Sequence, residues 1–148
     1  MTTKRVEKVI FIDDSEDEVF LARMLFEQQA IDLDIIHVAT PTRLEEACGS
    51  DAIGTGKAMI VVDLNMPEAH GTDVVRRLRQ DERYRDNVVG VCTGSDDPAD
   101  RKGALEAGAE FFVNKPLEKN ALSRICDQVE RLTLQDAKEG GCKLQMKL

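Results

Sequence analysis

Five polar residues stand at or just past the ends of short, unbroken apolar runs: Asp13, Asp14, Asp63, Thr93 and Lys115. An apolar run without alternation is typical of a parallel strand that is covered on both faces. In an open parallel sheet, the carboxyl ends of the strands lie side by side at one edge. We therefore expect these five side chains, although distant in sequence, to converge on one crevice.

Three carboxylates in one crevice repel one another, and a hard divalent cation is the usual remedy. Mg²⁺ suits one or two direct carboxylates with waters that complete the octahedron. Beside such a metal, Asp63 could act as a carboxylate nucleophile on phosphorus and form an acyl phosphate. Lys115 and the metal would then bind the other phosphoryl oxygens, and the Thr93 hydroxyl would donate to one of them. Each residue taken alone also has an ordinary structural interpretation, such as a helix cap or a solvated loop lysine.

The elements that must position these residues alternate along the chain. The pattern predicts strands at 9–12, 34–39, 59–62, 87–92 and 111–113. Helices are expected at about 16–29, 42–48, 72–84 and 98–107, with a fifth that carries Leu122, Ile125, Cys126, Val129 and Leu132 on one stripe. Five strands and five helices joined by short loops predict an α/β fold with a parallel sheet and right-handed crossovers.

Three local signals support this assignment. Ser15 and Glu18 form a capping box at the start of the first helix. Gly90 lies inside the fourth strand, where a missing side chain would let another group approach the backbone closely. The fourth helix contains Gly103 and few large apolar residues, so we expect it to be the least firmly held.

The C-terminal segment is predicted to differ from the rest. Gly140 and Gly141 are expected to end the fifth helix, which makes 1–139 the domain and 140–148 a tail. Apolar residues alternate with polar ones from Cys142 to Leu148, and this period suits an edge strand or an extended docking arm. A frayed tail is the alternative, which we favour slightly from sequence alone.

Composition excludes several classes of function. The chain has 28 acidic and 20 basic residues and a net charge of −8, which argues against binding to nucleic acids or to anionic membranes. No apolar run approaches a membrane span and the N-terminus lacks a signal-peptide core, so we expect a cytoplasmic protein. Four cysteines without a CxxC pair do not favour a zinc site or a disulfide framework.

The ordered set of motifs resembles a response-regulator receiver domain, the domain that sensor histidine kinases phosphorylate. The matching segments are Asp13-Asp14, Asp63 in Asp-Leu-Asn-Met-Pro, Gly71, Thr93-Gly94 and Lys115-Pro116. Asp13, Asp63, Thr93 and Lys115 are separated by about 50, 30 and 22 residues, as in that family, and the resemblance covers about 7–133. It implies a flavodoxin-like, doubly wound sheet with strand order 2-1-3-4-5.

The resemblance also implies a role for each matching residue. Asp63 resembles the phosphoacceptor, and Asp13, Asp14 and Asp63 resemble ligands of Mg²⁺, together with the backbone carbonyl of Asn65. Lys115 resembles the phosphate-contacting lysine. Thr93 and Phe112 resemble the switch pair, in which the hydroxyl moves toward the phosphate and the aromatic ring turns into the vacated space.

The implied protein is a single-domain response regulator of two-component signalling, without enzymatic activity beyond self-catalysed phosphoryl uptake and autodephosphorylation. Its donor would be a sensor histidine kinase or a phosphotransfer protein. Its output would be a switched surface on the fourth helix, fifth strand and fifth helix, and the formation of a homodimer is left open. The alternative within the same family is a phosphate sink or a relay intermediate for a shared kinase.

The sequence departs from the family in three places. Phe112 stands where Tyr is frequent, the loop at 50–57 is longer, and the segment beyond Gly140 has no counterpart. A haloacid-dehalogenase-type phosphatase is a less favoured alternative because its nucleophile follows the first strand in an Asp-x-Asp pattern that Asp13-Asp14 does not form. A flavin-binding module is disfavoured because no Ser/Thr/Gly-rich loop follows the first strand.

Overall fold

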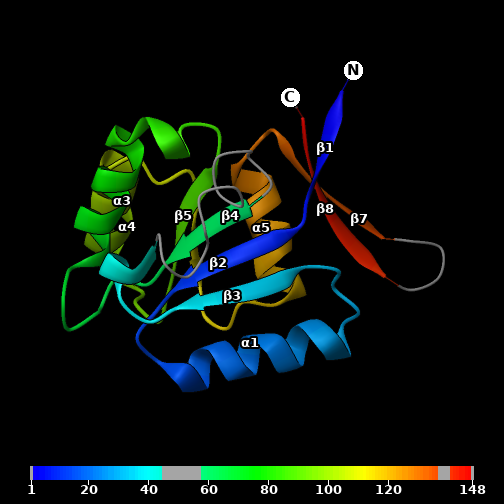
Figure 1. Ribbon diagram of the computed structural model, residues 1–148, viewed down its shortest axis with the longest axis horizontal. Helices are drawn as coiled ribbons and strands as arrows, with labels where there is room; N and C mark the ends of the chain where they lie inside the picture. Colours follow the sequence, from blue (N-terminus) through cyan, green and yellow to red (C-terminus); the bar gives the residue numbers. More distant parts are fainter. Residues whose placement is uncertain (1, 45–57, 137–140, 148) are drawn as a thin grey trace.

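The computed structural model describes residues 2–44, 58–136 and 141–147, in which helices and strands alternate along most of the chain (Figure 1). The strands are β1 (Thr3–Val6), β2 (Lys8–Ile12), β3 (Asp34–Val38), β4 (Ala58–Val62), β5 (Val88–Thr93), β6 (Phe112–Asn114), β7 (Leu132–Asp136) and β8 (Cys142–Lys147). The α-helices are α1 (Glu16–Gln28), α3 (Gly71–Gln80), α4 (Pro98–Glu106) and α5 (Lys119–Gln128). Among the described residues, no helix is both long and apolar enough to cross a membrane.

Five of the strands form a parallel sheet in the order β3-β2-β4-β5-β6. Numbered along the chain within this sheet, the order is 2-1-3-4-5, so the predicted fold class and strand order are confirmed. Helices α1 and α5 cover one face of the sheet, and α3 and α4 cover the other (Figure 1).

The alternation of side chains along each strand explains why both faces need a cover. In β2, Val9 and Phe11 belong to the core on the α1 and α5 side, whereas Ile10 and Ile12 belong to the core on the α3 and α4 side. Every residue of β4 is buried. The central strands β2, β4 and β5 therefore carry nearly continuous apolar runs, as expected of a doubly wound sheet, whereas the edge strand β3 contains Asp34 and His37.

The second and third predicted helices differ from what the structure describes. The part of the chain that is described holds four α-helices instead of five, because most of the segment expected to form the second helix falls within 45–57, outside the described residues. Its start is a 3₁₀ helix, Pro41–Arg43. The third predicted helix was too long: α3 ends at Gln80, and the Asp81 carboxylate then caps a separate 3₁₀ helix, Glu82–Tyr84.

Gly90 has the role that its position in a strand indicated. A Cβ atom on this residue would lie 2.3 Å from the ring of Phe111, which is fully buried. The prediction that some group approaches this backbone closely is confirmed, and the group is an aromatic ring from the residue directly before the neighbouring strand β6.

A second sheet, which the sequence did not predict, is formed by β1, β8 and β7 (Figure 1). β8 lies in the middle and pairs antiparallel with both neighbours, so that Leu144 pairs with Val6 on one side and Leu134 on the other. The backbone of Cys142 also bonds to Ala30 and Asp32 in the α1–β3 connection, with N···O distances of 2.8 and 2.7 Å. The second sheet is thus joined to the layer that contains α1 and α5.

The expectations for the C-terminal segment are therefore corrected. Helix α5 ends at Gln128 instead of near Gly140, because Val129 has extended backbone angles and Leu132 lies in β7, not on the helical stripe. The favoured frayed tail is wrong, and the expected edge strand is a central strand. The apolar side chains of β8 are buried in the same core as those of α1 and α5. This burial provides the driving force for β8 to pair into the second sheet.

Leu144 tests how strongly the second sheet is held. Its side chain is fully buried, so Leu144→Ala is expected to lower the free energy of unfolding by about 2–5 kcal/mol through the cavity that it leaves. Urea unfolding followed by circular dichroism measures this loss. Lys143→Ala, an exposed neighbour on the same strand, should change stability by less than about 0.5 kcal/mol. Equal and small effects of the two substitutions would mean that β8 contributes little to the fold.

Candidate functional site

The three predicted carboxylates converge at the carboxyl ends of β2 and β4. Asp13, Asp14 and Asp63 each offer an oxygen, and these oxygens all lie within 4.8 Å of one another. Asp13 is fully buried and Asp63 is 5% exposed, whereas Asp14 faces solvent. The site therefore has a dry base formed by two carboxylates and an open side formed by the third.

Lys115 reaches this cluster from the segment after β6. Its Nζ lies 2.8 Å from Asp13 Oδ2 and 3.6 Å from Asp63 Oδ1. The lysine side chain is only 16% exposed, so these ion pairs are shielded from water. The structure thus brings together residues from three strand ends, as the sequence predicted.

The electrostatics of the cluster reflect an excess of negative charge. Burial raises the pKa of the Asp63 carboxyl, and the nearby charge of Asp13 raises it further, while Lys115 and the backbone N–H of Asn65 oppose the shift. Burial alone would lower the pKa of Lys115, but its hydrogen bond to Asp13 and the charges of Asp13 and Asp63 raise it. Lys115 is consequently cationic at neutral pH, and one cation does not compensate three carboxylates.

The loop after Asp63 is closed tightly against the next helix. Gly71 donates its N–H to the carbonyl of Leu64 at 2.8 Å, and a Cβ on Gly71 would lie 2.2 Å from the carbonyl oxygen of Asp63. Only glycine permits this approach. His70 caps α3 by accepting from the N–H of Thr72.

The predicted switch residues lie on neighbouring strands. Thr93 ends β5 with no exposed surface, and its hydroxyl accepts from the N–H of Ser95 at 3.3 Å. Phe112 begins β6 and is 6% exposed within the same buried cluster as Ala104 of α4. Ala104 is the one buried residue within α4, which agrees with a weakly held helix.

Two polar residues support the site but were missed from sequence. The Nε2 of His37 on β3 donates to the backbone carbonyl of Asp13 at 2.7 Å and so anchors the loop that carries the first carboxylates. The Gln128 amide, at the end of α5, pairs with both the N–H and the carbonyl of Phe112, at 2.8 and 3.1 Å. No motif identifies such contacts, because they depend on which strand lies at the sheet edge.

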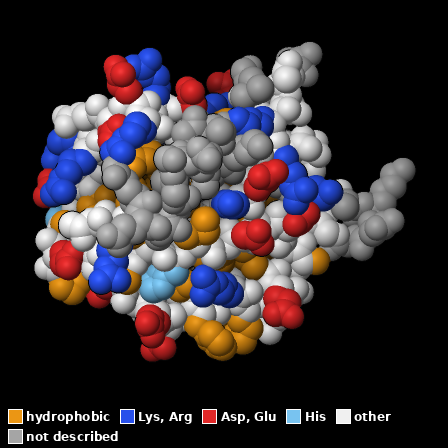
Figure 2. Space-filling view, viewed as in Figure 1, with side chains coloured by type: hydrophobic (Ala, Val, Ile, Leu, Met, Phe, Trp, Pro, Cys, Tyr) orange, Lys and Arg blue, Asp and Glu red, His pale blue; other side chains and the backbone are white. Residues whose placement is uncertain are grey.

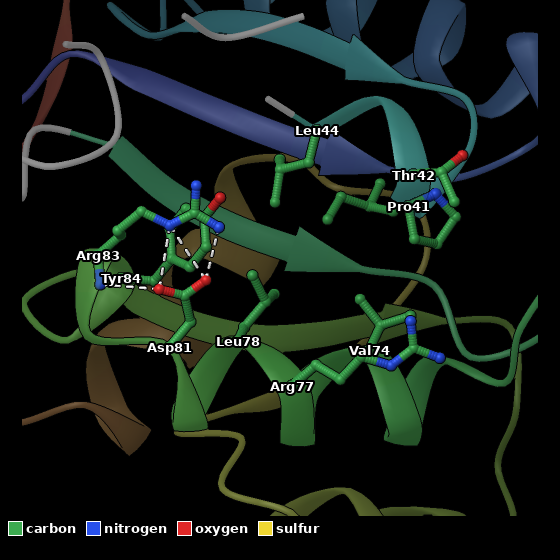
Figure 3. Close-up of a pocket in the computed structure, with 10 residues that line it drawn as sticks. Pro41, Thr42, Leu44, Val74, Arg77, Leu78, Asp81, Arg83 and Tyr84 are labelled. Carbon is green, nitrogen blue, oxygen red and sulfur yellow. Dashed lines mark hydrogen bonds and ion pairs between the residues drawn. The ribbon is translucent and has the colours of Figure 1, made fainter. Parts of the chain in front are cut away.

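A separate hollow of about 180 Å³ lies between α3 and the segment that follows β3 (Figure 3). Leu44, Val74 and Leu78 line it, beside an ion pair in which the Arg83 guanidinium contacts Asp81 at 2.7 Å. None of the predicted site residues is among its lining residues. The hollow and the acidic cluster are therefore distinct features.

The donor set at the cluster fits a hard divalent cation. All three groups are carboxylates and two of them are buried, and burial, with a further contribution from the charge of Asp13, raises the pKa of Asp63. Oxygen ligands of this kind match Mg²⁺ or a similar ion better than a soft transition metal. Asp13, Asp14 and Asp63 would hold it.

The fold and the site together define a doubly wound α/β domain with an acidic, metal-compatible crevice at the carboxyl ends of its strands. The sequence profile of the response regulator receiver domain matches residues 9–127, so the chain belongs to this family of two-component signalling domains.

Known proteins agree with this assignment. The chain is 28% identical over 134 residues to the two-component response regulator ORR3 of Oryza sativa subsp. indica, with 87% of this chain and 98% of that protein covered. It is 25% identical over 142 residues to the cyclic di-GMP phosphodiesterase response regulator RpfG of Xanthomonas campestris, covering 95% of this chain and 36% of that protein.

Solved structures support the fold. A putative response regulator from Chloroflexus aurantiacus superposes with a TM-score of 0.69 at 16% identity, covering 84% of this chain and 98% of that one. The Mn²⁺-bound form of the response regulator Rcp1 superposes with a TM-score of 0.59 at 19% identity, covering 82% and 88%.

Proposed function

We propose that this chain is a response regulator that accepts a phosphoryl group on Asp63 in a Mg²⁺-dependent step. The donor is the phosphohistidine of a sensor histidine kinase or of a phosphotransfer protein. An Asp63 carboxylate oxygen attacks phosphorus, the phosphorus–nitrogen bond breaks, and the imidazole leaves with the bonding electrons. Water later attacks the acyl phosphate, which restores the carboxylate and releases inorganic phosphate.

The residues of the cluster have distinct roles in this step. Asp13, Asp14, Asp63 and the backbone carbonyl of Asn65 would hold Mg²⁺, which supplies charge stabilisation to the phosphoryl oxygens when bound. Lys115 would exchange its contact with Asp63 for one with a phosphoryl oxygen, where its charge stabilises the transition state. The Thr93 hydroxyl would donate to another phosphoryl oxygen after transfer.

The observation that carries the proposal is the position of Lys115 Nζ, 2.8 Å from Asp13 and 3.6 Å from Asp63. A cation already seated beside a buried carboxylate lies where the charge of an incoming phosphoryl group would need to be stabilised.

Phosphotransfer tests the proposal directly. The protein is mixed with phosphorylated candidate kinases or with acetyl phosphate, with and without excess chelator, and its intact mass is followed. We expect the mass of one phosphoryl group to be added when Mg²⁺ is present and not when it is chelated. The proposal would be refuted if no donor gave the adduct, or if excess chelator left the uptake unchanged.

Phosphorylation would act on the surface formed by α4, β6 and α5. The added charge would draw Thr93 inward and bias α4, which is held by little apolar burial, between two arrangements. Hydrogen exchange over 94–116, measured with and without the phosphoryl group, follows this change.

The donor protein would dock on α1, which begins just after Asp14. Hydrophobic side chains gather over α1 in the space-filling view (Figure 2), and Phe20 and Met24 of this helix are 68% and 40% exposed. Exposed apolar side chains that lie one helical turn apart are typical of a protein contact.

Phe20→Lys is therefore expected to slow phosphotransfer from a protein donor by about tenfold or more, the effect of losing a central apolar contact. Uptake from acetyl phosphate should not change, because Phe20 lies outside the acidic cluster. Gln28→Lys adds the same charge at an exposed position of α1 and serves as the control. If both donors slowed equally, Phe20 would act on the site and not on docking.

A further inference from the structure

Asn114, the last residue of β6, contacts the loop that follows the predicted switch threonine. Its Nδ2 donates to the carbonyl of Ser95 at 2.9 Å and to Asp96 Oδ1 at 3.1 Å, and lies 3.5 Å from the carbonyl of Thr93. Asn114 and Ser95 are half-buried, so their bond is partly shielded from water, whereas Asp96 is exposed. The side chain thus bridges the end of β6 to the β5–α4 loop, residues 94–97.

The same loop is tied from its other side to α4. The Ser95 hydroxyl donates to Asp100 Oδ2 at 2.5 Å and accepts from the N–H of Asp97 at 3.2 Å. The N–H of Ser95 in turn donates to the Thr93 hydroxyl. In the unphosphorylated chain the Thr93 oxygen is therefore part of the hydrogen-bond network of this loop.

Asn114 is also the residue directly before Lys115. One short segment consequently carries both the amide that holds the β5–α4 loop and the ammonium that pairs with Asp13 and Asp63. Movement of the loop toward a phosphoryl group on Asp63 would stretch or break the contacts of Asn114. A contact made in only one of two arrangements stabilises that arrangement.

We propose that Asn114 is a positioning residue that holds the β5–α4 loop in its unphosphorylated arrangement and thereby limits how readily Thr93 engages the phosphoryl group. The inference rests on the proposed function, since it assigns a control element to the same site. Asn114 does not contact the phosphoryl group in this scheme and acts through Ser95 and Asp96.

The test compares Asn114→Ala and Asn114→Ser with the wild type, using acetyl phosphate as donor. We expect Asn114→Ala to take up the phosphoryl group about three to ten times faster, the factor that one lost hydrogen bond is worth. Asn114→Ser retains one donor and should be intermediate. Asn120→Ala makes the same change at an exposed position of α5 and should match the wild type.

Hydrogen exchange separates this role from a merely structural one. Positioning predicts that Asn114→Ala lowers protection over 94–97 only in the unphosphorylated protein, whereas a structural contact would lower it in both forms. Equal loss in both forms, or an uptake rate that is unchanged or slower, would overturn the inference. If the wild type took up no phosphoryl group, the proposed function and this inference would fail together. If the wild type took up the phosphoryl group and Asn114→Ala did so at the same rate, the inference would be wrong and the proposed function would stand.

Discussion

Asp63→Asn is expected to abolish phosphoryl uptake and, without divalent cation, to raise the melting temperature of the protein. Uptake is lost because an amide oxygen is a poor nucleophile toward phosphorus and cannot form the acyl phosphate. The stability gain arises first because the Asp63 charge is buried, and second because removing this charge relieves its repulsion with Asp13. A gain of about 1 kcal/mol would raise the melting temperature by roughly 2–4 °C for a domain of this size.

The pH dependence of this gain follows from the direction of the pKa shift. Because the pKa of Asp63 is raised in the folded protein, the fold favours the protonated carboxyl over the ionised one. The wild type therefore loses stability as pH rises from the usual Asp range through the raised pKa, and keeps that loss at pH 7. The extra stability of Asp63→Asn over the wild type should therefore be full at pH 7. It should vanish at a pH below the usual pKa range of an aspartate.

Scanning calorimetry in chelator, at pH 7 and at acidic pH, measures this difference. Asp86→Asn removes a charge from an exposed position and should leave the melting temperature nearly unchanged at both pH values. Mg²⁺ should raise the melting temperature of the wild type more than that of Asp63→Asn, since the wild type offers the better site. If Asp63→Asn were less stable than the wild type in chelator, the Asp63 charge would stabilise the folded protein and the prediction would be wrong.

Lys115→Met is expected to have the opposite effect on stability. The substitution keeps an unbranched side chain that is one atom shorter, but it leaves the fully buried Asp13 carboxylate without its cation. Removal of one partner from a buried ion pair costs about 3–5 kcal/mol, so the variant should unfold at clearly lower urea concentration than the wild type. Phosphoryl uptake should fall as well, because the charge that would meet the phosphoryl oxygens is absent.

The metal distinguishes this electrostatic cause from lost packing. Added Mg²⁺ should restore part of the stability of Lys115→Met, since a cation at the cluster replaces the missing charge. Lys119→Met is the matched control, because Lys119 pairs with Asp136 at the surface, where both side chains are well exposed. Such pairs contribute at most about 1 kcal/mol. A loss in Lys115→Met that Mg²⁺ does not reduce would indicate a packing defect.

The parallel sheet and the location of its site could be predicted because both depend on local patterns. Apolar runs marked β2 and β4, and the residues that end them are Asp13 and Asp63. Strand pairing then brings these ends together without further information, since parallel strands in register share one carboxyl edge. The same logic located Lys115 and Thr93, although their detailed roles remain predictions.

The patterns in the sequence therefore determined the fold class and the gathering of carboxylates and lysine at one edge, whereas the strand order was implied by the resemblance to receiver domains. Tertiary structure alone decided that α5 stops at Gln128 and that β1, β7 and β8 form a second sheet, because β1 and β8 pair from opposite ends of the chain and no local pattern encodes such pairing. It also decided that Asp13 is buried while Asp14 is exposed, and that Asn114 and Gln128 bond to neighbouring backbone. Those outcomes depend on which groups lie within hydrogen-bond distance after the chain has folded, a property of packing and not of spacing.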